Sequence, residues 1–478
     1  MDTQRRDPSH HHARPTAPTI TFAGAAGTVT GSKYLIETDA ATVLVDAGLY
    51  QGTKKLRLRN WERFPVEPAT IDAVVLTHAH LDHCGYLPLL VADGFTGPVF
   101  CSAHTAALAG IVLPDSGHLQ EEEADYANRK GFSKHHPAMP LYTEKDARAA
   151  MQSLQAIDFG RPTPLADGLT ITLEPAGHIL GSAIVHLDIA TRGEHRRVTF
   201  SGDLGRPNHP LLRPPSPLGR ADIVVIESTY GDRVHDDSAA LDLLAMAIQK
   251  TVKRGGVVVI PAFAVDRTEV ILAHLSTLRA SGAIPRVPIY VDSPMALRAL
   301  DVYRAALASD DPEVRPELQG TDPFDDDLLE ATHTVDESIE LDQLRFSAII
   351  VSASGMATGG RVLHHLKRYL PDHRATVILV GFQAQQTRGR DLIEGARQIK
   401  MLGHYIPVHA DIVDLPAFSV HADRNELVAW LATADTPPET VFITHGEPAA
   451  SESLQAIVSE QLGWNAVVPR YLERVRLD

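Results

Sequence analysis

Three histidines and one aspartate lie within six consecutive positions, as His78, His80, Asp82 and His83. They follow residues 71–76, an apolar run whose length and β-branched content predict a buried strand. In extended backbone, side chains two positions apart point the same way, so His78 and His80 can face one ion together. We expect Asp82 to be the N-cap of a following helix, which would turn Asp82 and His83 toward a second point nearby. Imidazole and carboxylate together favour zinc over calcium or magnesium, so the stretch predicts a two-metal hydrolase centre rather than a polar loop with chance histidines.

Three later strands also end before residues that can bind a metal. The pairs of predicted strand and potential ligand are 169–174 with His178, 197–201 with Asp203, and 222–226 with Glu227. Each residue alone could belong to an ordinary turn, but together they indicate one rim of ligands above a sheet edge. Asp46 ends another predicted strand, 42–46, where it either caps a turn or orients a metal-bound histidine.

Two further histidines occur at the ends of predicted elements near the C-terminus. His421 precedes a predicted helix at 424–432, and His445 follows a predicted strand at 440–443. They lie about 340 to 370 residues after His78. A split domain that closes on itself explains this separation most simply.

The middle of the chain alternates predicted helices with buried strands from residue 232 to residue 380. This alternation predicts a parallel sheet with helices on both faces, and hence a separate α/β domain. Between one strand and the next helix lie Ser354, Thr358, Gly359 and Gly360. Backbone N–H groups and hydroxyls at such a position can hold a phosphate, although a plain Gly/Ser loop fits equally well.

Length and composition restrict the class of protein. A chain of 478 residues is too long for one core and predicts two domains or one domain with a large insertion. Residues 1–18 are polar and proline-rich and are expected to form a disordered tail, and no stretch resembles a membrane span or a secretory signal. The two cysteines, Cys84 and Cys101, provide no disulfide framework, which fits a reducing cytoplasm.

The net charge of −16 argues against a nucleic-acid partner, but the distribution of charge weakens that argument. Residues 309–342 contain 13 acidic residues and one arginine, so most of the negative surplus lies in one segment. We expect this acidic segment to be solvated and irregular. The rest of the chain is close to neutral.

Taken together, these motifs are similar to those of the β-CASP branch of the metallo-β-lactamase superfamily, which includes the mRNA 3′-end-processing endonuclease. The resemblance extends over nearly the whole chain from about Thr19. It implies an α/β fold in which a metallo-β-lactamase αββα sandwich is split by an inserted parallel-sheet β-CASP domain. The implied parts are 19–231 for the first part of the sandwich, 232–419 for the β-CASP domain, and 420–478 for the second part.

The resemblance also implies the roles of the site residues. One zinc ion would be held by His78, His80 and His178, the other by Asp82, His83 and His445, and Asp203 would bridge the two. Asp82 would also orient the attacking nucleophile, and His421, held by Glu227, would be the general acid. Asp46 would orient a metal-bound histidine, and Ser354, Thr358, Gly359 and Gly360 would contact RNA phosphates.

These inferences predict a zinc-dependent ribonuclease with two Zn²⁺ per chain that cuts single-stranded RNA endonucleolytically in the cytoplasm, leaving 5′-phosphate and 3′-hydroxyl ends. A membrane partner is not expected, and self-association stays open. The alternatives are a 5′-to-3′ exoribonuclease, a DNA-processing nuclease of the same fold, a small-molecule hydrolase and a metal-free scaffold. His445 favours RNA over DNA, because the corresponding motif of the DNA-processing branch has a residue other than histidine at this position. The inserted domain argues against a small-molecule hydrolase, and the complete ligand set argues against a scaffold.

Overall fold

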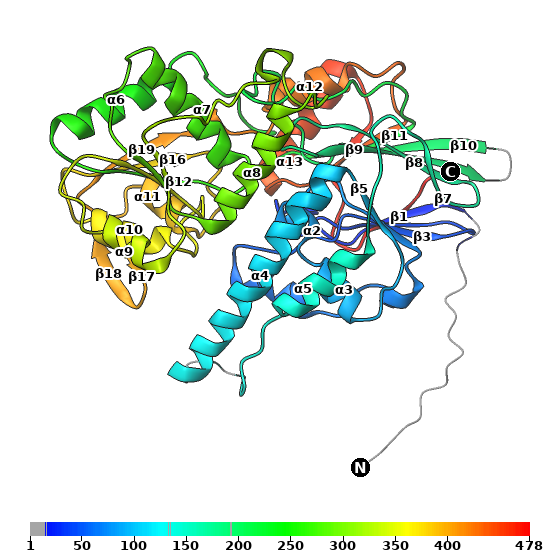
Figure 1. Ribbon diagram of the computed structural model, residues 1–478. Coiled ribbons are helices and arrows are strands. Elements are labelled where there is room, and N and C mark those ends of the chain that lie inside the picture. The colour runs from blue at the N-terminus through cyan, green and yellow to red at the C-terminus, as the bar shows by residue number, and fades with distance from the viewer. Residues whose placement is uncertain (1–14, 16, 132, 134, 192–193) are drawn as a thin grey trace.

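The computed structural model describes residues 15, 17–131, 133, 135–191 and 194–478, which form two parts lying side by side (Figure 1). Of the predicted disordered tail, residues 1–14 and 16 lie outside the described residues, so that prediction is not tested.

Two seven-stranded sheets pack face to face in the larger part. In spatial order, the first contains β22 (Arg474–Arg476), β1 (Thr19–Phe22), β2 (Tyr34–Glu37), β3 (Thr42–Val45), β4 (Ala73–Val75), β5 (Val99–Cys101) and β6 (Leu154–Ala156). The second contains β21 (Ala466–Val467), β20 (Thr440–Ile443), β11 (Ile223–Ile226), β10 (Glu194–Phe200), β9 (Ala183–Thr191), β8 (Leu169–Pro175) and β7 (Thr163–Ala166). Apolar side chains from both sheets fill the space between them, where the rings of Phe22 and Phe442 lie 5.0 Å apart.

Helices cover both outer faces of this sandwich. The first sheet is covered by α2 (Leu81–Cys84), α3 (Leu87–Ala92), α4 (Ala103–Lys130) and α5 (Glu144–Ala150), and the second by α12 (Arg424–Leu431) and α13 (Pro448–Ile457). A short helix, α1 (Lys54–Leu58), follows β3. Because β22 pairs with β1 and β20 pairs with β11, the C-terminal segment completes both sheets.

The smaller part contains a six-stranded sheet in which all paired neighbours are parallel. Its spatial order is β14 (Leu329–Ala331), β13 (Ile289–Val291), β15 (Ile349–Ser352), β12 (Val258–Pro261), β16 (Thr376–Val380) and β19 (Asp411–Leu415). One face packs against α6 (Ala240–Lys253), α7 (Arg267–Ala280) and α8 (Pro294–Ala308). The other packs against α9 (Val335–Leu341), α10 (Val362–Tyr369), α11 (Arg388–Ile393) and the hairpin of β17 (Gln398–Met401) and β18 (His404–Pro407).

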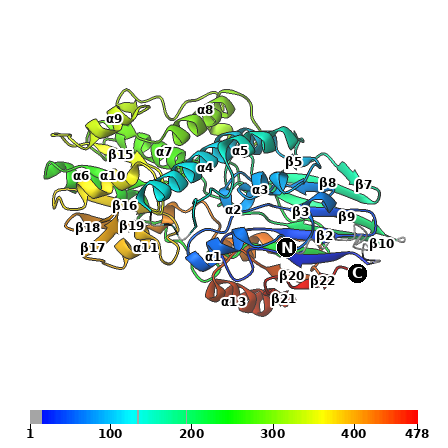
Figure 2. The same cartoon turned by 90° about the horizontal axis from the view of Figure 1, so that it is seen from below.

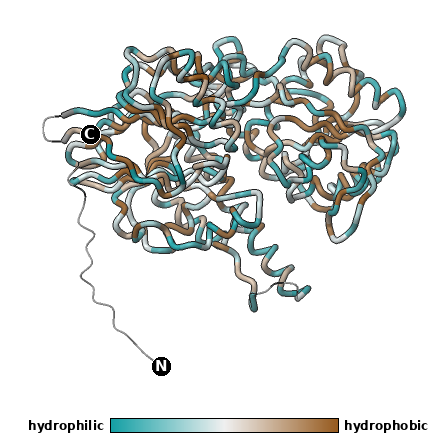
Figure 3. The backbone as a smooth tube through the Cα atoms, turned by 180° about the vertical axis from the view of Figure 1, so that it is seen from behind, coloured by the Kyte–Doolittle hydropathy of each residue, from teal (hydrophilic) through white to brown (hydrophobic). Residues whose placement is uncertain are grey.

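The alternating pattern of the buried strands explains this arrangement. On β12, Val258 and Ile260 join one core while Val259 joins the other, because successive strand residues point to opposite faces. Figure 3 shows hydrophobic residues concentrated along the strands in the middle of each part. The predicted fold class, a sandwich with an inserted parallel-sheet domain, is therefore confirmed. The predicted boundaries at 231/232 and 419/420 stay a proposal.

Two parts of the sequence prediction need correction. The prediction missed β9, which pairs with β8 over residues 183–189 and with β10 over residues 185–191; the polar residues His186 and Asp188 interrupt its apolar pattern. The acidic segment 309–342 is not irregular throughout, because it contains β14 and α9, whose N-cap Thr334 forms a capping box with Glu337. Among the described helices, none has the length and apolar composition needed to cross a membrane.

Candidate metal centre

The predicted ligands meet at one edge of the sandwich, beyond the ends of its strands. Because β10, β11 and β20 are parallel neighbours, the residues that follow them, Asp203, Glu227 and His445, leave the sheet at the same edge. His78 and His80, which follow β4 of the facing sheet, reach the same place. Packing of the two sheets thus brings together ligands that are far apart in sequence.

The first cluster consists of His78, His80, His178 and Asp203, whose ligand atoms all lie within 4.8 Å of one another. His80 Nδ1 lies 3.1 Å from His78 Nε2 and 3.3 Å from His178 Nε2. Asp203 Oδ2 lies 3.5 Å from His78 Nε2 and 3.7 Å from His178 Nε2. Ligands of a tetrahedral zinc ion, each about 2.0–2.1 Å from the metal, are about 3.4 Å apart, so these separations fit such an ion.

The second cluster consists of Asp82, His83 and His445. His445 Nε2 lies 3.0 Å from His83 Nε2 and 3.5 Å from Asp82 Oδ2. The second carboxylate oxygen of Asp203, Oδ1, lies 3.2 Å from His83 Nε2. Asp203 therefore faces both clusters with different oxygens.

The prediction that Asp82 caps the following helix is wrong. The N-cap of α2 is His80, and Asp82 lies in the first turn. The helix begins earlier than expected because His80 is the last residue in extended backbone, with φ −68° and ψ 146°. The Asp82 carboxylate is consequently directed at His445 rather than at the N–H groups of its own helix.

Asp46 fixes the orientation of one histidine of the second cluster. It is fully buried, and its Oδ2 accepts a hydrogen bond of 2.7 Å from His83 Nδ1. Its Oδ1 accepts a hydrogen bond of 2.8 Å from the backbone N–H of Thr77. With a proton on Nδ1, His83 presents its bare Nε2 to the cluster, which is the tautomer that binds a metal.

Glu227 and His421 form a pair beside the first cluster. His421 Nδ1 lies 3.3 Å from Glu227 Oε1, and the Glu227 carboxylate is held in turn by the backbone N–H of Leu204 at 2.7 Å. The side chain of His421 is 16% exposed, whereas that of Glu227 is buried. His421 Nδ1 also lies 3.9 Å from Asp203 Oδ2, so the geometry alone allows either an acid or a ligand role for His421.

The electrostatic surroundings suit neutral imidazole ligands in the first cluster. Burial lowers the pKa values of His78 and His178 well below the ordinary range and lowers the pKa of His80 to about 4. At His83, burial acts in the same direction, but the charges of Asp203 and Asp46 outweigh it and raise its pKa. A cation in the second cluster therefore competes with a proton on His83.

The donor set and its unsatisfied atoms fit divalent cations. Among the described residues, Asp203 Oδ1 is buried and accepts no hydrogen bond, and His80 Nε2 likewise has no partner. A buried carboxylate oxygen without a donor is costly, and a cation between the ligands removes that cost. The two clusters thus have the ligand types, the spacing and the unmet charge of a two-metal site.

The predicted phosphate loop lies close to this centre. Phe263, which follows β12, lies between the loop and the ligands. Its ring centroid is 6.4 Å from that of His80, and a side chain added at Gly355 would collide with Phe263. Ser354 Oγ accepts hydrogen bonds from the N–H groups of Thr358 at 3.0 Å and Gly359 at 3.3 Å. Two of the N–H groups that the sequence assigned to a phosphate are therefore already paired with a serine.

The sequence prediction missed several residues that support the ligands. Thr229 Oγ1 lies 3.1 Å from His445 Nδ1, and the backbone carbonyl of Val420 accepts a hydrogen bond of 3.4 Å from His178 Nδ1. Both lie within two positions of residues that the prediction did select, Glu227 and His421. Their positions close to predicted ligands could have identified them as candidates. Their partners could not be predicted, because each hydrogen bond joins segments that are far apart in the chain.

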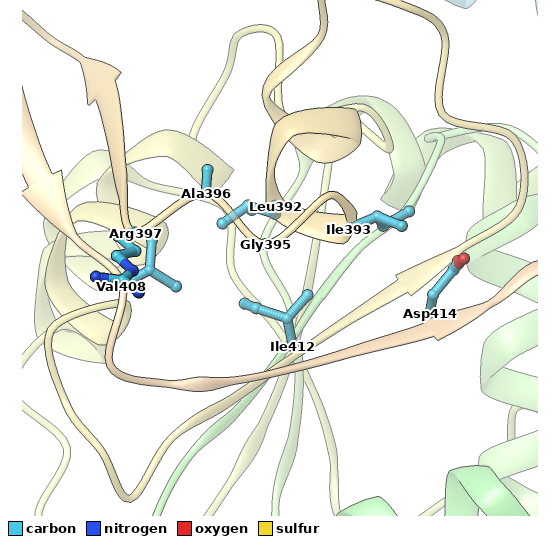
Figure 4. A pocket seen from close by; sticks show the side chains of 8 residues that line it. All are labelled: Leu392, Ile393, Gly395, Ala396, Arg397, Val408, Ile412 and Asp414. Atoms are coloured by element: carbon cyan, nitrogen blue, oxygen red, sulfur yellow. The ribbon is translucent and has the colours of Figure 1, made fainter.

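A separate pocket of about 320 Å³ lies in the inserted domain between α11 and β19 (Figure 4). Its lining is largely apolar, with Leu392, Ile393 and Ile412, and it includes the charged residues Arg397 and Asp414. It contains none of the predicted ligands and is distinct from the metal centre.

Three family profiles match successive stretches of the chain. The metallo-beta-lactamase superfamily profile matches residues 26–251, the Beta-Casp domain profile matches 268–392, and the profile of the Zn-dependent metallo-hydrolase RNA specificity domain matches 405–469. Ribonuclease TTHA0252 of Thermus thermophilus is 37% identical over 427 residues, which cover 89% of this chain and 92% of that protein. Transcription termination factor FttA of Pyrococcus horikoshii is 32% identical over 480 residues, covering 96% of this chain and 71% of that protein.

A solved structure, that of a protein of unknown function from Enterococcus faecalis V583, shares the fold. Its TM-score is 0.52 at 15% sequence identity, and the match covers 96% of this chain and 100% of that one.

Fold and site together define a metal-dependent hydrolase of the metallo-β-lactamase type. Within that superfamily, the chain belongs to the β-CASP family. The predicted resemblance and the predicted enzyme class are therefore confirmed, and the family implies that the clusters bind divalent metal.

Proposed function

We propose that this protein is a zinc-dependent ribonuclease that binds two Zn²⁺ per chain and cuts single-stranded RNA endonucleolytically, leaving 5′-phosphate and 3′-hydroxyl ends. The observation that carries the proposal is the pair of ligand clusters sharing Asp203, whose two oxygens face different clusters. The match to an RNA specificity domain and the similarity to a protein named as a ribonuclease support RNA as the substrate. Two buried, unpaired cysteines support the cytoplasm as its location.

The ligand assignment follows the two clusters. The residues that would hold one zinc ion are His78, His80 and His178; those that would hold the other are Asp82, His83 and His445; and Asp203 would serve both. When bound, a zinc pair supplies a nucleophile at neutral pH and stabilises the charge of an in-line phosphoryl displacement.

The remaining residues act on the proton and on the substrate. Glu227 holds Nδ1 of His421, which leaves Nε2 free to donate a proton to the departing 3′ oxygen. The side chain of Asp82 is 20% exposed, so it can orient the attacking group from the open side of the site. Ser354, Thr358, Gly359 and Gly360 would contact a substrate phosphate, which would replace Ser354 Oγ as the acceptor for the N–H groups of Thr358 and Gly359.

The test combines metal analysis with two labelled RNAs. Purified protein should contain about two zinc ions per chain, and His80→Ala should abolish hydrolysis. His118→Ala is the matched control, because this histidine on α4 has a side chain that is 56% exposed and should be dispensable. Trace zinc together with full activity after chelation would overturn the proposal.

The cleavage mode is read from the products. Internally labelled RNA should yield fragments of intermediate length at early times, with 5′-phosphate ends. Release of mononucleotides from 5′-labelled RNA before any intermediate fragment appears would instead establish a 5′-to-3′ exoribonuclease. Preferential cleavage of single-stranded DNA would reassign the substrate.

A further inference from the structure

A basic segment, residues 54–63, stands out in this acidic chain. It contains Lys54, Lys55, Arg57, Arg59 and Arg63 but a single acidic residue, Glu62, although the net charge of the whole chain is −16. It forms α1 and a following 3₁₀ turn, Arg59–Trp61. Such a concentration of positive charge is the electrostatic feature of a surface that binds nucleic acid.

Core packing does not account for most side chains of this segment. Helix α1 has no buried residue, and Leu58 and Trp61 are 51% and 59% exposed. Within the part of the chain that the structure describes, no ion pair involves Lys54, Lys55 or Arg57, so their charges are uncompensated. The segment thus combines an exposed tryptophan with side-chain charges that have no ion-pair partner. Surfaces that bind single-stranded nucleic acid combine an aromatic ring, on which a base stacks, with positive charge in the same way.

Two residues hold the segment firmly in place. Asn60 is buried, and its side chain accepts a hydrogen bond of 2.9 Å from the backbone N–H of Tyr50 and donates one of 2.8 Å to its carbonyl. The guanidinium of Arg59 lies 4.3 Å from the ring centroid of Tyr471. The exposed cations and Trp61 are therefore presented on a rigid support, which lowers the entropic cost of binding.

The chain that leads into the segment is bonded to α2, the helix that carries the ligands Asp82 and His83. The N–H of Ala47 donates to the carbonyl of His83 at 2.8 Å, and the N–H of Leu49 donates to that of Leu81 at 2.8 Å. Lys54 lies five positions after Leu49, so their Cα atoms are at most about 18 Å apart. In the view of Figure 2, α1 is drawn at the end of the larger part that is nearer the inserted domain.

We propose that the basic segment is a binding surface for the RNA strand that is cut at the metal centre, with Lys54, Lys55 and Arg57 contacting phosphates and Trp61 stacking on a base. This inference rests on the proposed ribonuclease function and adds a second contact region outside the site itself. It predicts that affinity for long RNA depends on the segment, whereas turnover of a minimal substrate does not.

The test uses the full-length metal-loaded protein. Lys54→Gln/Lys55→Gln/Arg57→Gln should raise KM for a 20-nucleotide single-stranded RNA and should reduce the slope of log affinity against log salt by about 2, since each phosphate contact on a single strand contributes about 0.7. The kcat for a dinucleotide should stay unchanged. Trp61→Ala should weaken binding about 5- to 150-fold, while Trp61→Phe should retain most of the affinity.

The matched control is Arg129→Gln/Lys130→Gln/Lys145→Gln, which removes three equally exposed positive charges from the ends of α4 and α5. It should leave both KM and the salt slope at wild-type values. The inference is overturned if both triple variants weaken binding equally, if neither does, or if polyglutamate binds the segment as tightly as RNA. Failure of the wild type to cut any RNA would instead refute the proposed function.

Discussion

Asp46→Asn is the substitution that most directly tests how the fold controls the second ligand cluster. The change removes one charge and replaces one oxygen by an NH₂ group while keeping the size of the side chain. Asp46 is completely buried, so solvent cannot satisfy the new donor. The consequence depends on which of its two oxygen positions the NH₂ group occupies.

Both orientations of the new amide create a conflict. If NH₂ takes the Oδ2 position, it faces His83 Nδ1 across 2.7 Å, and His83 must move its proton to Nε2, the atom directed at His445. If NH₂ takes the Oδ1 position, it faces the backbone N–H of Thr77 across 2.8 Å. A buried unsatisfied donor costs about 1–3 kcal/mol. That corresponds to about a 5- to 150-fold loss of metal affinity, in line with the roughly 10- to 100-fold loss seen when groups that support a ligand are removed.

Competition with a chromophoric chelator measures this loss for each metal separately. We expect one zinc ion of Asp46→Asn to be lost at chelator concentrations that leave the wild type saturated. The other ion, held by His78, His80 and His178, should keep its affinity, because Asp46 does not contact that cluster. Hydrolysis of RNA should recover when excess zinc is supplied.

Asp292→Asn is the matched control. Asp292 is also a fully buried carboxylate with a histidine partner, since His365 Nε2 donates to it at 2.6 Å, but it lies in the inserted domain. This variant should lose thermal stability and retain both zinc affinities. If Asp46→Asn binds both ions as tightly as the wild type, the orienting role assigned to Asp46 is wrong.

Three further predictions concern other parts of the molecule. His421→Ala should retain both zinc ions and RNA binding but lose about 10²- to 10⁴-fold in kcat, and a substrate with a sulfur leaving atom should partly restore the rate; a missing zinc ion would make His421 a ligand instead. Ser354→Ala should raise KM for RNA more than it lowers kcat, and an unchanged KM would make the loop purely structural. At His365, burial lowers the pKa, but the hydrogen bonds that its ring donates to Asp292 and Asp342 outweigh burial, so the folded-state pKa is raised. The resulting stabilisation is complete below the unfolded pKa of about 6.5 and is lost as pH rises through the folded value. The difference in Tm between wild type and His365→Asn should therefore shrink at alkaline pH, and a difference independent of pH would contradict this reasoning.

The sequence by itself determined the types of the ligands and the elements that carry them. His78, Asp203 and His445 each follow an apolar run short enough to be a buried strand, and both features are local in the chain. The parallel sheet of the inserted domain could also be predicted, because its alternating helices and strands repeat over many residues. Local hydrophobic periodicity carries this information without any knowledge of tertiary contacts.

Only the tertiary structure decided how these ligands are arranged. Asp203 could be identified as a ligand from its position after a strand, but the division of its two oxygens between two clusters depends on how two sheets pack. The preference of aspartate for helix N-caps predicted the wrong position for Asp82. Its carboxylate is directed instead at His445, which is 363 positions away in the chain. The support of His445 by Thr229 and the exposure of Trp61 are likewise long-range outcomes. Side-chain partners and exposure depend on contacts between distant segments, and a local sequence pattern does not specify those contacts.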